Sequence, residues 1–322
     1  MPTKATKTPR CSIVIRTFNE ERHIGRLLED IQSQTLQDVE IILVDSGSTD
    51  HTLEIVSNFP VQVMHILPGE FTFGRSLNRG IAAARAEIIV LASAHVFPIQ
   101  DDWLDKLIAP FEDPKMAMSY GKQRGGENSK FSEDQHFRSW FPEKSEIDQE
   151  RAFANNANAA IRRSFWEQNH FDEELTGLED VAWASWAREQ GYKIAYIAEA
   201  GVIHHHDESA AQIINRHRRE AIALKQILPE SRFTFRNFLS LTTRSIFSDF
   251  AAARKEKVLL RETIGIKSFR TLQYWGTYLG YRQSGELSPE MRHVFYYPPG
   301  SLAAQNGASG KDQNLSRRQG KQ

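Results

Sequence analysis

The sequence predicts an α/β fold in which a mostly parallel central sheet is flanked by helices and followed by a C-terminal helical region. Two observations carry this prediction. Short β-branched runs alternate with amphipathic helical patterns along the first half of the chain, which is typical of parallel strands joined by crossover helices. Beyond residue 206 this alternation stops and helical periodicity dominates.

The first crossover is predicted from three consecutive segments. Residues 12–16 form a β-branched strand pattern, residues 20–34 carry apolar side chains at helical spacing, and residues 39–44 form the next apolar strand. The turn at 45–50 contains small residues and hydroxyls that can cap a following helix.

The second crossover uses a strand at 61–67, a helix at 74–86 and a fully buried strand at 87–90. Because right-handed crossovers bring the carboxyl ends of parallel strands to one edge of a sheet, the polar turns after these strands should meet there. The turns concerned are 17–20, 45–48 and 93–95.

The middle of the chain changes character after a further predicted strand at 116–122. Residues 124–150 are polar and charged, and are interpreted as a long excursion or a mobile loop. Regular secondary structure is predicted again over residues 152–163, and a helix is predicted over 181–190. The last predicted strands cover residues 193–198 and 201–206, the second of which ends in three histidines.

Composition excludes several classes of protein. Of the 322 residues, 40% are hydrophobic, which is enough for a large core, and a net charge of −1 argues against nucleic-acid binding. The single cysteine, Cys11, excludes a disulfide framework and a zinc site built from cysteines. The sequence has no signal-peptide pattern and no run of about 18 apolar residues that could span a membrane, so we expect a cytoplasmic protein.

Three motifs stand in order along the chain. They are SIVIRTFNE at 12–20, VDSGSTD at 44–50 and GLED at 177–180. Together they resemble the signatures of family 2 glycosyltransferases with the GT-A fold, over roughly residues 10–220. The resemblance implies inverting transfer of a sugar from a nucleotide-diphosphate donor to a hydroxyl, with Asp180 as the catalytic base. It also places Thr17, Phe18, Glu20 and Asp45 around the base and ribose of the donor.

The proposed role of Asp180 is chemically reasonable. Inverting transfer needs a carboxylate that accepts the proton of the acceptor hydroxyl, and cationic groups that stabilise the leaving diphosphate. Asp180 lies near a predicted helix N-terminus, whose dipole would lower its pKa and weaken its basicity. The alternative is that Glu179 and Asp180 only favour the helix start. Asp45 likewise could contact the donor, cap its own turn, or do both.

The chain departs from the family at residues 93–95. Family members generally carry Asp-x-Asp there, which binds the ribose and a divalent ion, whereas this chain has Ser93, Ala94 and His95. Ser93 can still bond a ribose or phosphate, but His95 suits manganese better than magnesium. The related polypeptide N-acetylgalactosaminyltransferases are similar here, with an Asp-x-His motif and a distant histidine. His204 and His206 project to one side of a strand and could supply that ligand.

Three interpretations of the histidines stay open. In the first, His95 with His204 or His206 holds a divalent ion, Mn²⁺ or Mg²⁺. In the second, no metal is used, and His95, Arg75 or Arg79 contacts phosphate directly. In the third, the late histidines are a solvated strand end, which we favour for His205.

Two further groups are candidate ligand contacts. In helix 74–86, Arg75 and Asn78 could reach the donor sugar or phosphates, or could lie on a solvated helix face. Asn155 and Asn156 offer amides to acceptor hydroxyls beside Glu179, although asparagine-rich turns also form for local reasons.

The predicted organisation is a tail at 1–10, a GT-A catalytic domain at 11–228, a helical region at 229–300 and a disordered tail at 301–322. Residues 231–270 combine aromatic side chains with nine Lys or Arg against three acids. Such a segment can lie on an anionic membrane, here the inner face, or can pack on the catalytic domain.

The expected partners are a nucleotide-sugar donor and a glycan or lipid-linked acceptor, and the family suggests bacterial surface polysaccharide synthesis. One rival is a nucleotide-sugar-binding protein without catalysis. Another is a sugar nucleotidyltransferase, although the glycine-rich, arginine-containing loop of such enzymes is absent after the first strand.

Overall fold

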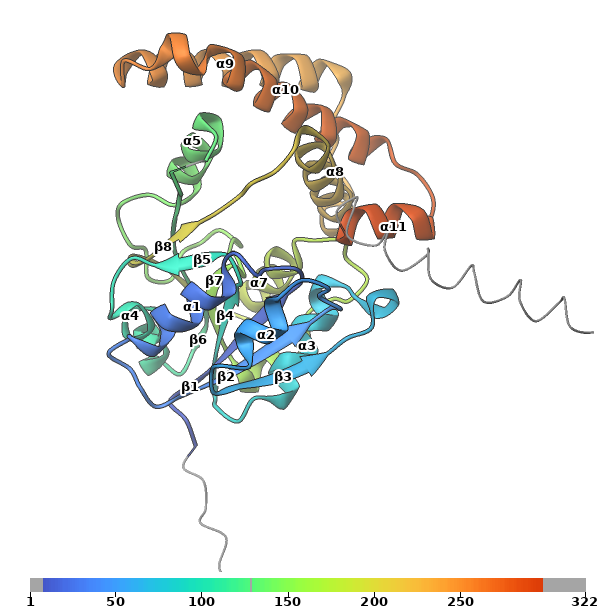
Figure 1. The fold of residues 1–322 in the computed structure, drawn as a ribbon. Helices are drawn as coiled ribbons and strands as arrows, with labels where there is room; N and C mark the ends of the chain where they lie inside the picture. Colours follow the sequence, from blue (N-terminus) through green and yellow to red (C-terminus); the bar gives the residue numbers. More distant parts are fainter. Residues whose placement is uncertain (1–7, 128, 298–322) are drawn as a thin grey trace, which may run out of the picture.

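The structure is a computed structural model that describes residues 8–127 and 129–297. It confirms the predicted α/β architecture, because an eight-stranded sheet carries helices on both faces and further helices follow it (Figure 1). The predicted tail at 301–322, and the tail at 1–10 apart from its last three residues, lie outside the described residues.

The sheet has the strand order β3-β2-β1-β4-β7-β6-β8-β5. Its strands are β1 (Cys11–Thr17), β2 (Val39–Asp45), β3 (Val61–His65), β4 (Ile88–Ser93), β5 (Val96–Pro98), β6 (Met116–Gly125), β7 (Asn158–Arg162) and β8 (Lys193–His204). The first four are parallel where they pair, with Thr17 opposite Asp45 and Arg16 opposite Ser93. The predicted convergence of the three polar turns is therefore confirmed.

Two apolar cores lie on opposite faces of this sheet. One forms beneath α1 (Ile24–Gln32) and α4 (Trp103–Ile108), and the other beneath α3 (Phe73–Ala83) and α7 (Glu179–Glu189). The helical spacing read in the sequence accounts for this packing: Ile24, Leu27, Leu28 and Ile31 of α1 are all buried. Two short helices, α2 (Thr52–Val56) and α6 (Arg163–Trp166), complete this part of the fold.

Three details of the predicted elements are wrong. The segment 124–150 is not only a loop, because it contains α5 (Phe131–Trp140), of which only Ser132, Glu133 and Phe137 are buried. Residues 193–204 form one long strand, β8, instead of two. The short edge strand β5 pairs with β8 and was not predicted.

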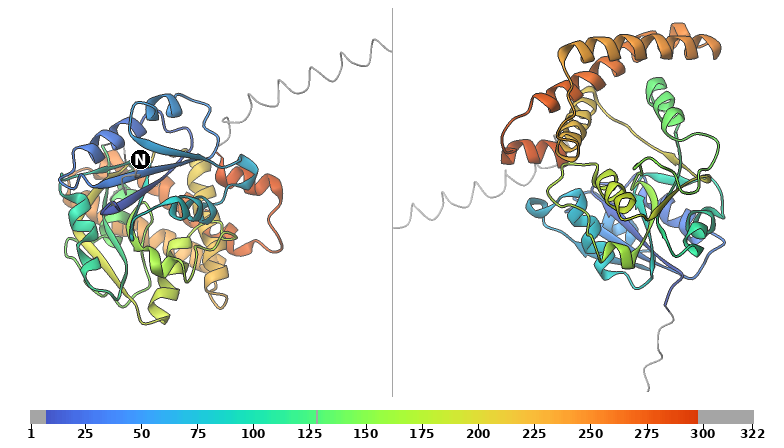
Figure 2. Two further views of the ribbon diagram at one scale, coloured as in Figure 1. Left: turned by 90° about the horizontal axis from the view of Figure 1, so that it is seen from below. Right: turned by 180° about the vertical axis from the view of Figure 1, so that it is seen from behind.

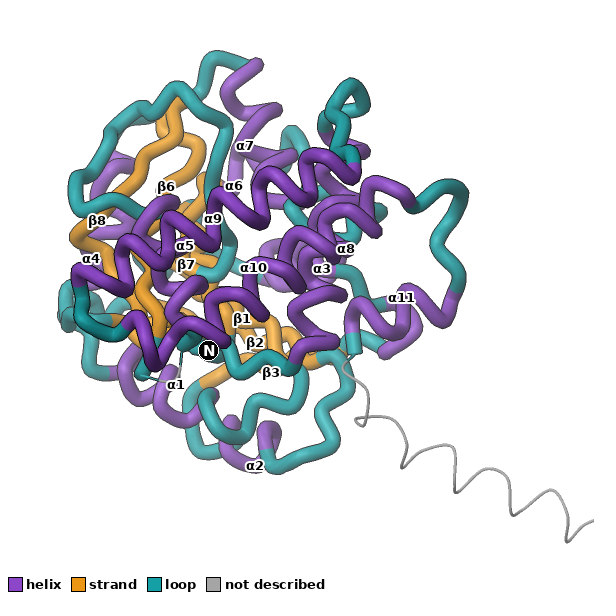
Figure 3. The backbone as a smooth tube through the Cα atoms, turned by 90° about the horizontal axis from the view of Figure 1, so that it is seen from above, coloured by secondary structure: helices purple, strands orange, loops and turns teal. Residues whose placement is uncertain are grey.

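The chain after β8 is helical, as predicted. It forms α8 (Ala210–Ile227), α9 (Phe235–Lys255), α10 (Leu259–Arg282) and α11 (Pro289–Tyr296). Helix α10 packs on α8 and α9, and α9 also contacts α5, so α9 and α10 form a layer above the sheet while α11 returns toward α3 (Figures 2 and 3). Within the described part of the chain, none of the helices combines the length and the apolar character needed to cross a membrane.

Candidate active site

The loops that follow β1 and β2 are joined by hydrogen bonds at the predicted edge. The backbone N–H of Ser46 donates to the Thr17 carbonyl oxygen at 3.0 Å. The Asp45 carboxylate accepts hydrogen bonds from Gly47 and Ser48, so it caps its own turn as one reading of the sequence expected. The Thr17 hydroxyl is buried and has no hydrogen-bond partner among the described residues. It is therefore available to a ligand.

Asp180 lies buried in the first turn of α7. Its two carboxylate oxygens accept backbone N–H bonds from Asn156 at 3.0 Å and from Val181 at 2.8 Å. Burial and the neighbouring Glu179 charge raise the pKa of Asp180 to about 7. The expected lowering by the helix N-terminus is thus wrong in sign, because burial outweighs the two N–H bonds. The carboxylate is fixed in position and basic enough to accept a proton near neutral pH.

Two arginines that were not among the predicted site residues lie beside Asp180. Arg16, at the end of β1, donates to Glu179 at 3.2 Å. The guanidinium groups of Arg16 and of Arg219 in α8 lie 4.9 and 4.4 Å from the centre of the same Phe73 ring. Arg219 donates to the Phe295 carbonyl oxygen at 2.9 Å, while its buried Nε has no hydrogen-bond partner in the part of the chain that the structure describes. Two guanidinium groups therefore lie near Glu179 and the Phe73 ring.

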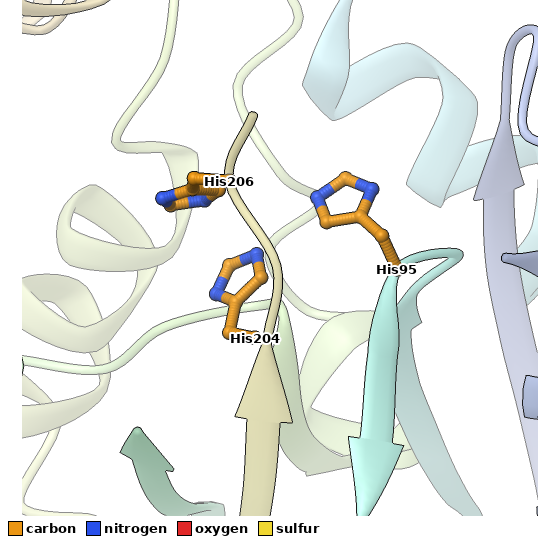
Figure 4. Close-up of side chains that lie close together, drawn as sticks. All are labelled: His95, His204 and His206. Atoms are coloured by element: carbon orange, nitrogen blue, oxygen red, sulfur yellow. The ribbon is translucent and has the colours of Figure 1, made fainter. Parts of the chain in front are cut away.

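Three histidines meet on the other side of this edge (Figure 4). The ring centres of His95 and His204 are 5.1 Å apart, and those of His204 and His206 are 4.2 Å apart. One ring nitrogen from each lies within 4.8 Å of the others. The structure thus brings together the three residues that the sequence offered as metal ligands.

Each histidine directs its Nδ1 atom to an acceptor on another element. The pairs are His95 with Glu20 Oε1 at 2.7 Å, His204 with Gln123 Oε1 at 2.7 Å and His206 with Glu133 Oε1 at 2.8 Å. An Nδ1–H bonded in this way fixes the ring and leaves Nε2 as the free nitrogen, which is the usual arrangement around a metal-binding histidine.

The electrostatic surroundings differ among these rings. Burial and the nearby imidazoles of His206 and His95 hold the pKa of His204 well below its ordinary value, so His204 is neutral. Burial also disfavours a charge on His95, but the charge of Glu20 and its hydrogen bond outweigh burial and raise the pKa of His95. In the absence of a metal, His95 therefore takes up a proton more readily than His204.

The structure gives Glu20 a partner and corrects one expectation about this region. The carboxylate of Glu20, which was expected near the donor base, contacts His95. His205 was interpreted as part of a solvated strand end, whereas its ring is half-buried and lies 5.8 Å from that of His23 and 5.1 Å from that of Phe97.

The α3 candidates are engaged within the fold. The Asn78 amide is buried, donates to the Phe171 carbonyl oxygen and accepts from the indole N–H of Trp166. Arg75 pairs with Glu173 at 2.6 Å. Asn78 does not lie on the solvated helix face that was the alternative, whereas the side chain of Arg75 is partly exposed. The polar atoms of Arg75 and Asn78 thus hold the segment that contains Phe171 and Glu173.

The remaining candidates fall into two groups. Ser93 ends β4 at the site edge, while the Ala94 side chain is buried in the core and leaves only its backbone for a ligand. Asn155 accepts a bond from the backbone N–H of Ala157 within its own turn. Asn156 donates to Glu179 at 3.4 Å, and its side-chain oxygen has no hydrogen-bond partner within residues 8–127 and 129–297.

The fold and this edge define a glycosyltransferase of the GT-A class. The particular family follows from residues 12–168, which match the model described as Glycosyl transferase family 2. These residues, just under half of the chain, carry the domain of this family, so the family resemblance read in the sequence is confirmed over this range.

Curated relatives agree with this assignment. The O-antigen chain rhamnosyltransferase RfbN of Salmonella typhimurium is 27% identical over 220 residues, which cover 65% of this chain and 70% of the relative. The O-antigen chain rhamnosyltransferase WbaN of Salmonella anatum is 28% identical over 225 residues, with the same coverage of both chains.

Solved structures share the fold at low sequence identity. Mannosyltransferase PcManGT from Pyrobaculum calidifontis, in complex with GDP-Man and Mn²⁺, has a TM-score of 0.59 and 19% identity, covering 85% of this chain and 86% of that one. S. aureus TarS 1-349 in complex with UDP-GlcNAc has a TM-score of 0.52 and 17% identity, covering 82% and 90%.

Proposed function

We propose that the protein is an inverting glycosyltransferase that moves a sugar from a nucleotide-diphosphate donor to a hydroxyl of a glycan or lipid-linked acceptor in bacterial surface polysaccharide synthesis. One observation carries this proposal: Asp180 is a buried carboxylate, held by two backbone N–H groups, whose pKa is raised to about 7. The O-antigen rhamnosyltransferase relatives support the polysaccharide setting, and the solved complexes with GDP-Man and UDP-GlcNAc support a sugar-nucleotide donor.

The proposed mechanism assigns a task to each group at the edge. Asp180 accepts the proton of the acceptor hydroxyl as its oxygen attacks the anomeric carbon. Glu179 and the free carbonyl oxygen of the Asn156 side chain receive the acceptor hydroxyls. Arg16 and Arg219 stabilise the charge of the leaving diphosphate. The donor is contacted by Thr17, Phe18, Asp45, Ser93 and the backbone of Ala94. Glu20 orients the ring of His95 through its hydrogen bond to Nδ1.

The histidine cluster fits a divalent ion. Its three imidazoles have their Nδ1 atoms held by Glu20, Gln123 and Glu133, and three nitrogens without a carboxylate favour a transition ion such as Mn²⁺ over Mg²⁺. A bound ion would neutralise charge on the leaving diphosphate. The metal-free alternative, in which protonated His95 contacts phosphate, is supported by the raised pKa of that ring.

We test the assignment by donor turnover. The purified protein is incubated with UDP-, GDP- and dTDP-sugars, with and without Mn²⁺, and nucleoside diphosphate release is measured. We expect release that falls by about 10²- to 10⁴-fold in Asp180→Asn, which removes a general base. The control Asp113→Asn changes an aspartate that pairs with Lys193 at the other end of the strands and should keep the wild-type rate. A protein that binds a donor without turnover in any acceptor mixture would instead be the non-catalytic binding protein.

We also propose that the α9–α10 hairpin contacts the membrane that carries a lipid-linked acceptor, at its cytoplasmic face. Near the hairpin turn, Leu260 is 95% exposed, Ile264 81% and Phe247 67%. These apolar side chains share the turn with exposed cations at Arg254, Lys255, Lys257, Arg261 and Lys267, against the acids Glu256 and Glu262. Apolar anchors with surplus positive charge suit an anionic bilayer surface.

Vesicle flotation tests this contact. We expect the protein to float with phosphatidylcholine vesicles that contain about one-third phosphatidylglycerol and to stay behind with phosphatidylcholine alone. The double variant Leu260→Ser/Ile264→Ser should lose flotation, whereas Leu67→Ser, an exposed leucine after β3, should keep it. If the hairpin variant floats normally, or if it only abolishes self-association measured by light scattering, the membrane contact is wrong.

A further inference from the structure

The nucleobase end of the proposed donor site is covered by the C-terminal segment of the same chain. Tyr297, directly after α11, is only 4% exposed. Its ring centre lies 4.8 Å from that of Phe18 and 5.9 Å from that of Phe71. Its hydroxyl shares a hydrogen bond with the side chain of Ser46. The Tyr297 ring therefore lies against the ends of β1 and β2.

The groups under this cover are those that a base would use. Thr17 is 3% exposed, and Asp45 and Ser46 are each 1% exposed. The Thr17 hydroxyl has no hydrogen-bond partner among the residues that the structure describes. A buried hydroxyl without a partner is costly in a folded protein, which indicates a group awaiting a ligand. The side chains of Thr17, Asp45 and Ser46 that could recognise a base are thus shielded from solvent in this structure.

The same segment also engages the diphosphate end of the site. Arg219, which we assign to the leaving diphosphate, donates to the carbonyl oxygen of Phe295, and Phe295 is itself buried. Tyr296 packs against Phe71 and Phe73. One short segment therefore contacts the Ser46 side chain at the base end and one nitrogen of the Arg219 guanidinium at the phosphate end.

We propose that Tyr297 occupies the place of the donor nucleobase, against Phe18, Ser46 and Phe71, until the donor displaces it. A phenol resembles a base in being a flat ring with a hydrogen-bonding edge, so one can replace the other on Phe18 and Ser46. This inference rests on the proposed function, since it presumes a nucleotide donor at this edge. Donor binding would free Arg219 from Phe295 as it removes Tyr297.

Competition of this kind weakens donor binding by a calculable factor. Apparent affinity falls in proportion to the fraction of molecules whose nucleobase site is open, so a segment docked about 90% of the time costs about tenfold in Kd. Removing the Tyr297 ring should lower the apparent Kd for the nucleotide by about the same tenfold. Removing only the phenol hydroxyl should lower the Kd less, because Phe would keep the ring contacts but lose the hydrogen bond to Ser46.

The experiment measures nucleotide binding to the full chain by calorimetry, with UDP, GDP and dTDP in the presence of Mn²⁺. We expect Tyr297→Ala to bind its preferred nucleotide about tenfold more tightly than the wild type, and Tyr297→Phe to lie between them. The control Tyr278→Ala, in α10, should match the wild type. Equal or weaker binding by Tyr297→Ala overturns the inference, because Tyr297 would then be inert or a permanent wall of the nucleobase site.

Hydrogen exchange gives a readout that does not depend on a substitution. Saturating nucleotide should speed amide exchange in residues 291–297 of the wild-type protein, since α11 is released. Slower exchange there would show that the segment closes over the nucleotide, and would contradict displacement. If no nucleotide binds to the wild type or to any variant, the proposed donor site itself is wrong, which is a different result from binding that ignores Tyr297.

Discussion

Asp180 combines two influences that oppose each other. The backbone N–H groups of Asn156 and Val181 stabilise its charged form, whereas burial and Glu179 destabilise it, and the second pair prevails. This combination suits a general base. The two N–H bonds hold the carboxylate in one position, and the raised pKa of Asp180 preserves its affinity for a proton.

At the residue scale, the histidine cluster predicts selective metal binding. We expect His95→Ala and His206→Ala to weaken Mn²⁺ or Co²⁺ binding strongly, and Gln123→Leu, which removes the acceptor of His204, to weaken it by about 10- to 100-fold. Equilibrium dialysis with metal analysis measures this. His51→Ala, at an exposed histidine, serves as the control. Unchanged binding in His95→Ala and His206→Ala would exclude the cluster as a metal site.

The same cluster predicts how metal binding depends on pH. The pKa of His95 is raised by Glu20 despite burial, and a protonated ring cannot ligate a metal. Metal affinity should therefore fall as the pH drops through the range in which His95 gains its proton. The Glu20→Gln variant removes the negative charge that raises the pKa of His95. The loss of metal affinity should therefore occur at a lower pH in this variant than in the wild type. Dialysis across the pH range checks this, and an identical pH profile in both proteins would contradict it.

Sequence motifs predicted where several residues of the proposed site lie, because the spacing of the motifs sets which strand or helix ends carry them. Asp180, Asp45 and the three histidines lie at the shared edge that the strand pattern predicted. The sequence could not show that Glu20 turns to His95 or that Asn78 is buried, because side-chain partners far apart in the chain depend on tertiary packing. Arg16 was inside a recognised motif, but its position next to Glu179 became visible only with α7 in place.

At the element scale, α5 has a role that its sequence did not reveal. Its face toward the protein is mostly polar and buries few side chains, so apolar periodicity gave no helical signal. The helix nevertheless places Glu133 between His206 and Arg216, with oxygen–nitrogen distances of 2.8 Å to each. Strongly periodic helices such as α1 and α3 were predicted because their apolar faces pack on the sheet.

This position predicts a stability effect for Glu133→Gln. Burial opposes ionisation, but the bond from His206 and the charges of His206 and Arg216 lower the pKa of Glu133 to about 2. A lowered pKa means that the stabilisation is present above the unfolded-state pKa and is lost as the pH falls toward 2. We expect a loss of about 3 kcal/mol near neutral pH, as for other broken buried pairs, and a smaller loss in acid.

Urea denaturation at neutral and acidic pH measures this difference. Glu143→Gln is the matched control, because Glu143 pairs with Lys122 and Arg124 at the exposed surface, where such pairs contribute little. A Glu133→Gln variant as stable as the wild type at neutral pH would show that the α5 contact is dispensable.

At the scale of the whole molecule, the site joins parts that lie far apart in sequence. The family match covers residues 12–168, yet the proposed site also includes Asp180 from α7, His204 from β8 and Arg219 from α8. The C-terminal helices then add a layer over the sheet, with α11 beside α8 (Figure 1). The alternation of strands and helices predicted the catalytic half, but helical periodicity alone could not predict where α11 would dock.

The most direct test of the central claim is the pH dependence of kcat/KM for sugar transfer. A base with a pKa of about 7 must be deprotonated to act, so the rate should rise with pH to a plateau, with its midpoint near that value. In Asp180→Asn the remaining rate should be far lower and should lose this ascending limb. An Asp180→Asn enzyme with the wild-type rate and the wild-type pH profile would contradict the assignment of Asp180 as the catalytic base.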